Sequence, residues 1–119
     1  MEVQIFGVKK SVETRKALRF FSERRIKTHF VDLAERPASP QELRRFAQRY
    51  GVEALIDRDS RAYAEQGLRH ARLSDDRWLE KLGEEPLMLR MPLVRHVGSG
   101  ARGLTIGLAE DEWRQWTAS

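Results

Sequence analysis

Ser11 stands where a strand meets a helix, in a turn that carries much positive charge. Residues 3–17 read as a short apolar strand, a turn at Gly7, the basic pair Lys9 and Lys10, and the start of a helix. A cysteine at position 11 would make this turn a redox site, because a helix N-terminus lowers the pKa of a thiol. The chain contains no cysteine. Its sequence therefore excludes thiolate catalysis, disulfides and cysteine-ligated metals.

A serine at this turn has three possible uses. As a nucleophile it needs a general base, for which only Lys9 or Lys10 is near in sequence. A helix N-terminus stabilises an anion by up to ~2 kcal/mol, which lowers a pKa by about 1.5 units. The pKa of an alcohol lies much further above neutral pH than that, so the Ser11 hydroxyl stays protonated. As an N-cap, Ser11 would accept a hydrogen bond from the helix start. As part of an anion site, it would join free N–H groups and the charges of Lys9, Lys10 and Arg15 around a phosphate, sulfate or carboxylate. The residues favour the cap, and anion binding stays open.

Composition limits the other function classes. A chain of 119 residues predicts one domain. The net charge of +4 is modest, and the arginines are interleaved with acids, which argues against a nucleic-acid-binding protein. His29, His70 and His96 lack the spacing of metal ligands. No apolar run approaches the ~20 residues that span a bilayer, and the sequence opens on a strand without a signal core. We therefore expect no metal, no membrane and a cytoplasmic location.

Hydrophobic patterns predict two strands and a helix at the start of the chain. Residues 2–6 and 26–33 read as strands, and the helix between them begins after Ser11 and runs to about Arg25. The expected inner stripe of this helix is Thr14, Ala17, Leu18 and Phe21. The opening is therefore a β-α-β unit.

Helix-start signals mark the middle of the chain. Ser39, with Pro40 and Glu42 after it, forms a capping-box pattern for a helix that ends near Tyr50. A short helix is expected over 60–66, and another begins after Ser74. Residues 93–97 and 104–108 then read as two strands joined by a glycine-rich hairpin turn. A last helix opens at residue 110 and should turn Trp113 and Trp116 toward the body.

The chain resembles the ArsC-like family of thioredoxin-fold proteins, which includes arsenate reductases and Spx-type transcription regulators. The resemblance rests on the order and spacing of five segments, 5–11, 14–17, 54–58, 91–95 and 105–113. It implies an α/β, thioredoxin-like fold: β-α-β, then a helical insert at about 39–84, then β-β-α, with a mixed four-stranded sheet in a single domain over 1–119. It also implies that the Met91–Pro92 bond is cis.

The same resemblance implies a site from which key residues are missing. Arsenate reductases of this type have a cysteine at the position of Ser11 and arginines at the positions of Asp57 and Met91. Arg90 and Arg95 flank the proline and could supply part of the lost charge. Ser11 thus occupies the catalytic position and is expected to be inactive. The expected anion- or ligand-binding residues are Lys9, Lys10, Thr14, Arg15, Arg90, Met91, Pro92 and Arg95.

Two functions follow from the resemblance. In the first, the chain is a non-catalytic binding or regulatory module, similar to Spx-type proteins that contact RNA polymerase. Its binding surface would include Arg15, Arg19, Arg44 and Arg45. In the second, it is a glutathione- or thiol-dependent reductase whose cysteine is replaced by Ser11. A cysteine codon at position 11 of the natural gene would favour the second function, and a serine codon the first. Beyond glutathione, no cofactor is expected.

Overall fold

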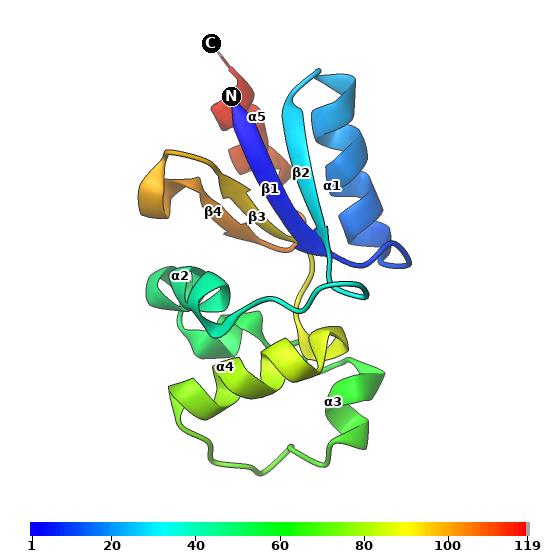
Figure 1. Cartoon of the computed structure of the whole chain (residues 1–119), viewed down its shortest axis with the longest axis vertical. Coiled ribbons are helices and arrows are strands. Elements are labelled where there is room, and N and C mark those ends of the chain that lie inside the picture. Colours follow the sequence, from blue (N-terminus) through cyan, green and yellow to red (C-terminus); the bar gives the residue numbers. More distant parts are fainter. Residues whose placement is uncertain (119) are drawn as a thin grey trace. The chain divides into compact units, whose positions relative to one another are not determined.

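The computed structural model describes residues 1–118, which form two compact units. The first unit comprises Met1–Arg36 and the chain from Met91 onward, and the second comprises Pro37–Arg90. All four predicted strands lie in the first unit (Figure 1). Within residues 1–118 no helix is both long and apolar enough to cross a bilayer. The single domain with a helical insert at about 39–84 stays a prediction.

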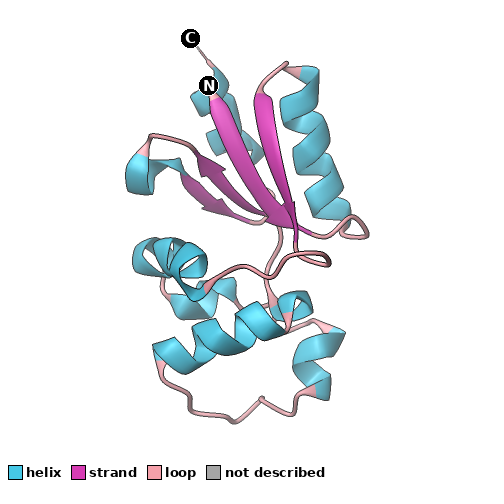
Figure 2. Cartoon of the chain, in the orientation of Figure 1, coloured by secondary structure: helices cyan, strands magenta, loops and turns pink. Residues whose placement is uncertain are grey.

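A mixed four-stranded sheet with the order β2-β1-β3-β4 forms the first unit (Figure 2). Strand β1 (Glu2–Gly7) pairs parallel with β2 (Lys27–Asp32) and antiparallel with β3 (Leu93–His96). Strand β3 pairs antiparallel with β4 (Leu104–Ile106). Helix α1 (Val12–Glu23) connects β1 to β2, and α5 (Glu110–Thr117) follows β4. The predicted α/β class and the β-α-β and β-β-α halves are confirmed.

One face of this sheet packs against both α1 and α5. Val3, Ile5 and Val94 form the sheet side of the core, and Phe21 of α1 and Trp113 of α5 lie against them. All five are fully buried. This apolar cluster holds α1 and α5, which are distant in sequence, against the same face of the sheet.

The inner face of α1 differs in part from the predicted stripe. Phe20 is buried, whereas Leu18 is only partly buried. The ring of Trp113 lies 5.4 Å from that of Phe20, so a contact from the far end of the chain widens the buried face. The helix also ends earlier than predicted, at Glu23, because Arg25 takes a left-handed conformation with φ of 57°.

The second unit contains three α-helices, α2 (Pro40–Tyr50), α3 (Arg61–Glu65) and α4 (Asp75–Glu84). The capping box of α2 is confirmed: Ser39 Oγ accepts from the Glu42 N–H (3.1 Å), and Glu42 Oε1 accepts from the Ser39 N–H (3.0 Å). Two short 3-10 helices, η1 (Val52–Leu55) and η2 (Pro86–Met88), were not predicted. In the first unit a further 3-10 helix, η3 (Gly100–Gly103), stands where the sequence predicted a simple hairpin turn.

Candidate functional site

Ser11 is the N-cap of α1. Its Oγ accepts a hydrogen bond from the Thr14 N–H (3.2 Å), and its carbonyl oxygen accepts from the Arg15 N–H (3.1 Å). The Ser11 N–H donates to the Val8 carbonyl oxygen (3.1 Å), which closes the turn between β1 and α1. Within residues 1–118 no lysine amine or histidine ring hydrogen-bonds to Ser11. The hydroxyl is therefore held as a cap and has no base beside it.

Two N–H groups at the start of α1 remain available. A helix begins with four N–H groups that have no partner inside the helix, and here the Ser11 and Thr14 groups are bonded as described above. The Val12 and Glu13 N–H groups have no hydrogen-bond acceptor among residues 1–118. Both residues are exposed. The turn thus presents the pair of donors that an anion could bind.

The charges around the turn are mostly solvated. Lys9 and Lys10 are exposed, and Lys9 Nζ lies 4.0 Å from Asp32 Oδ2. Lys10 and Arg15 make no ion pair within the part of the chain that the structure describes. Glu13 places one acidic side chain in the first turn of the helix. The turn therefore combines three cations with two nearby carboxylates and keeps a small positive excess.

Thr14 has a structural position in the turn. Its side chain is fully buried, and its Oγ1 has no hydrogen-bond partner among the described residues. A Cβ atom added to Gly7 would clash with Thr14 Oγ1. The close approach of Gly7 to Thr14 therefore brings the end of β1 against the first turn of α1. The sequence did not predict this contact, because its one local sign is a glycine between a strand and a helix, which does not indicate the residue that the glycine approaches.

The strand register brings Met91 and Pro92 to the same end of the sheet as the Ser11 turn. Leu93 lies opposite Phe6, so Pro92 follows beside Gly7, where β1 ends. The Met91–Pro92 bond is cis, as the resemblance implied. Pro92 is buried, and its carbonyl oxygen accepts from the Gly107 N–H (2.8 Å). These residues form the neighbouring wall of the candidate site in the first unit.

Two of the predicted arginines lie elsewhere. Arg95 is opposite Gln4, and its NH1 group donates to Gln4 Oε1 (3.4 Å). It is three residues along β3 from Pro92, which is about 10 Å of extended strand. Arg90 is exposed and belongs to the second unit, where its N–H donates to the Leu55 carbonyl oxygen (2.9 Å). Of the predicted cations, only Lys9, Lys10 and Arg15 are close in the chain to Ser11.

Comparison with known families decides the identity of the chain. The sequence pattern of the ArsC family matches residues 6–116. The chain belongs to the ArsC family. No curated protein matches its sequence.

Solved structures share the fold of this ArsC-family chain along almost its whole length. The YFFB protein has a TM-score of 0.85 at 19% identity, covering 98% of this chain and 99% of that one. An arsenate reductase from Vibrio cholerae has a TM-score of 0.70 at 26% identity, with coverage of 87% and 95%. An arsenate reductase (ArsC) related protein from Brucella melitensis has a TM-score of 0.67 at 20% identity, with coverage of 100% and 97%. The predicted thioredoxin-like fold is confirmed.

Asp57 occupies a position for which the resemblance implies an oxyanion-binding arginine, and it has a different role in this ArsC-family chain. The Asp57 N–H donates to the Met88 carbonyl oxygen (2.7 Å). Its Oδ1 accepts from the Asp59 N–H (3.1 Å), so the carboxylate stabilises the turn that leads to α3.

Ser11→Ala should lower the free energy of unfolding by about 1 kcal/mol, because the Thr14 N–H loses its acceptor. Urea denaturation monitored by circular dichroism measures this loss. Ser22→Ala is the matched control, since Ser22 lies in the last turn of the same helix and is exposed. Its change should stay within about 0.5 kcal/mol. Equal effects of the two substitutions would show that the Ser11 hydroxyl does not cap the helix.

Proposed function

We propose that this ArsC-family chain is a binding or regulatory module without thiol redox chemistry, and that the turn from Val8 to Arg15 is its recognition element. One observation carries the proposal: the Ser11 hydroxyl is engaged as a helix cap, in a chain that has no cysteine. The ligand of the turn would be an anionic group. The Val12 and Glu13 N–H groups would bind it, and the positive charges of Lys10 and Arg15 would neutralise its charge. We expect this module in the cytoplasm.

The family match also supports a second function, a glutathione- or thiol-dependent reductase whose cysteine is replaced by Ser11. A coupled assay that follows NADPH oxidation with arsenate, glutathione and glutaredoxin separates the two functions. We expect no turnover above a no-protein control, because no side chain in this sequence can supply the attacking thiolate. Turnover above that control would overturn the proposed non-catalytic function.

Selective amide shifts test the recognition element. Sulfate or phosphate added to the labelled protein should shift the amide resonances of Lys10, Ser11, Val12 and Glu13 in a saturable way, because two of these N–H groups are free to donate. Sodium chloride at equal ionic strength is the control. Small uniform shifts over the whole surface would indicate charge screening and would contradict an anion site at this turn.

For a protein partner we propose RNA polymerase, as the resemblance to Spx-type proteins suggests. Arg15 and Arg19 are exposed on α1 and would contribute to the contact. Binding to purified RNA polymerase should be saturable, and Arg15→Glu should weaken it about tenfold. Lys27→Glu is the matched control, because Lys27 is an exposed cation on β2. Equal losses of affinity in both variants would show that the effect comes from net charge alone. An absence of binding would exclude this partner.

A further inference from the structure

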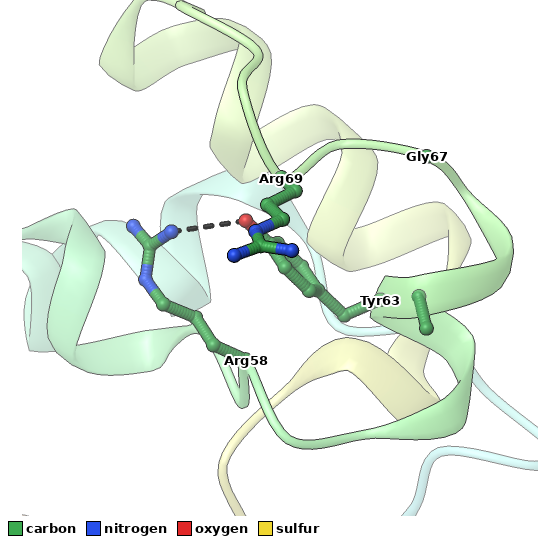
Figure 3. A pocket seen from close by; sticks show the side chains of 5 residues that line it. Arg58, Tyr63, Gly67 and Arg69 are labelled. Atoms are coloured by element: carbon green, nitrogen blue, oxygen red, sulfur yellow. Dashed lines mark hydrogen bonds between the residues drawn. The ribbon is translucent and has the colours of Figure 1, made fainter.

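A pocket of about 500 Å³ lies in the second unit, apart from the Ser11 turn in the sequence. Its lining comes from the turn before α3, from α3 itself and from the segment after it. The apolar part of the wall consists of the Tyr63 ring and Ala64, and Gly67 leaves the rim without a side chain (Figure 3). Small-molecule sites usually combine such apolar walls with a few polar groups. The polar groups here are two arginines, Arg58 and Arg69.

Tyr63 fixes one of these arginines. The Tyr63 side chain is buried, with 5% of its surface exposed, and its hydroxyl donates to the Leu68 carbonyl oxygen (3.2 Å). The same hydroxyl oxygen accepts from Arg58 NH1 (2.9 Å). Glu53 is the acid paired with Arg58, at 3.9 Å, and the side chain of Glu53 is 81% exposed. Such a long, solvated ion pair leaves most of the guanidinium's donors available.

Arg69 has no hydrogen bond or ion pair within residues 1–118. It lines the same pocket as Arg58 and Tyr63 (Figure 3). Two guanidinium groups that face one cavity repel each other, and an anion between them removes the repulsion. Arginine also binds phosphate and carboxylate oxygens through paired N–H donors. The pocket thus has donors and charge for an anion, next to an aromatic wall.

We propose that this pocket binds a small phosphate monoester that carries an aromatic or apolar group. The phosphate would lie between Arg58 and Arg69, because its two negative charges match the two guanidinium groups. The apolar group would lie against the Tyr63 ring and Ala64. Inorganic phosphate would fill only the charged part of a cavity of this volume. This site is independent of the Ser11 turn and uses none of its residues.

Phenyl phosphate is the probe, titrated into the labelled full-length protein and followed by amide resonances. We expect saturable one-to-one binding with shifts centred on residues 58–69, and binding of inorganic phosphate about tenfold weaker. Benzoate, which carries a carboxylate in place of the phosphate, should bind more weakly than phenyl phosphate. Shifts confined to Lys10–Glu13 would assign the anion to the α1 turn and overturn this proposal. Equal affinity for phenyl phosphate and inorganic phosphate would likewise overturn it, since the apolar wall would then contribute nothing.

Four variants separate the pocket from general charge effects. Arg69→Gln should weaken phenyl phosphate binding about tenfold without changing the fold, because Arg69 has no partner among the described residues. Arg58→Gln should weaken it similarly, and Ala64→Leu should do so by filling the pocket at constant charge. Arg61→Gln is the matched control: Arg61 lies on α3, is 91% exposed and pairs with Glu65. Equal losses in Arg61→Gln and Arg69→Gln, or full affinity in Ala64→Leu, would overturn the site.

Discussion

Trp113→Ala should lower the free energy of unfolding by about 3–5 kcal/mol, the usual cost of removing a large aromatic side chain from a core. Trp113 is fully buried on α5, and its ring lies 5.4 Å from that of Phe20 and 5.3 Å from that of Phe21. Nearby atoms can close only part of the resulting cavity, because Phe21 and Val94 are held by the sheet and by α1. A loss of this size corresponds to a fall in melting temperature of about 10–20 °C.

The indole N–H of Trp113 adds a separate contribution. It donates to Thr105 Oγ1 (2.9 Å), and Thr105 is 1% exposed. Trp113→Phe keeps much of the ring packing but leaves that hydroxyl without its donor, at a cost of about 1–3 kcal/mol. The alanine variant should therefore be clearly less stable than the phenylalanine variant. Chemical and thermal denaturation of both proteins measure the difference.

Trp116→Ala is the matched control for Trp113→Ala. Trp116 lies one turn further along α5, is only partly buried, and has its ring 6.5 Å from that of Phe21. Since less of its surface leaves water on folding, its removal should cost less than half as much. Equal effects of the two substitutions would mean that α5 does not turn Trp113 into the core. The packing of α1 against the sheet would then need another explanation.

Local signals in the sequence were sufficient to locate the helix starts. Ser11, Ser39, Ser60 and Ser74 are all N-caps, and each side chain accepts from an N–H three residues later. A cap depends on a four-residue segment, so its chemistry is visible without knowledge of the fold. For the same reason, the strands and their order along the chain could be predicted from short patterns of apolar residues.

Contacts between distant segments could not be predicted in the same way. Phe20 is buried because Trp113 arrives from the last helix. Arg95 turns toward Gln4 because the register of β1 and β3 sets these residues opposite each other, and no short pattern in the sequence encodes that register. The pocket at Tyr63 was missed because its two arginines, Arg58 and Arg69, are separated by a helix that brings them to one cavity.

Ser11→Cys should create a thiol whose pKa lies well below the ordinary value of about 8.5. The Ser11 side chain already accepts from the Thr14 N–H at the start of a 12-residue helix. A thiolate there would receive the same N–H donor and the positive end of the helix dipole, worth up to ~2 kcal/mol or about 1.5 pKa units. Exposed Lys10 and Arg15 add to this effect in the same direction.

The rate of alkylation by iodoacetamide as a function of pH measures this pKa. The introduced thiol is the only one in the chain, because the sequence has no cysteine of its own. Ser22→Cys is the matched control, since Ser22 is exposed in the last turn of the same helix, where the dipole disfavours an anion. Its pKa should lie at or above about 8.5. The two variants must be compared by the pH at the midpoint of each rate curve and not by the rates themselves, since a thiolate of lower pKa is also a weaker nucleophile.

A lowered pKa in Ser11→Cys would not by itself restore arsenate reduction. Asp57 and Met91 stand where the resemblance implies the two arginines that hold the oxyanion, so both of those arginines are missing. We therefore expect rapid alkylation near neutral pH and no turnover in the coupled NADPH assay. A pKa at or above that of Ser22→Cys would contradict the helix-start geometry. Turnover by Ser11→Cys would show that a thiol alone completes the site, and the natural residue at position 11 would then decide between a reductase and a binding module.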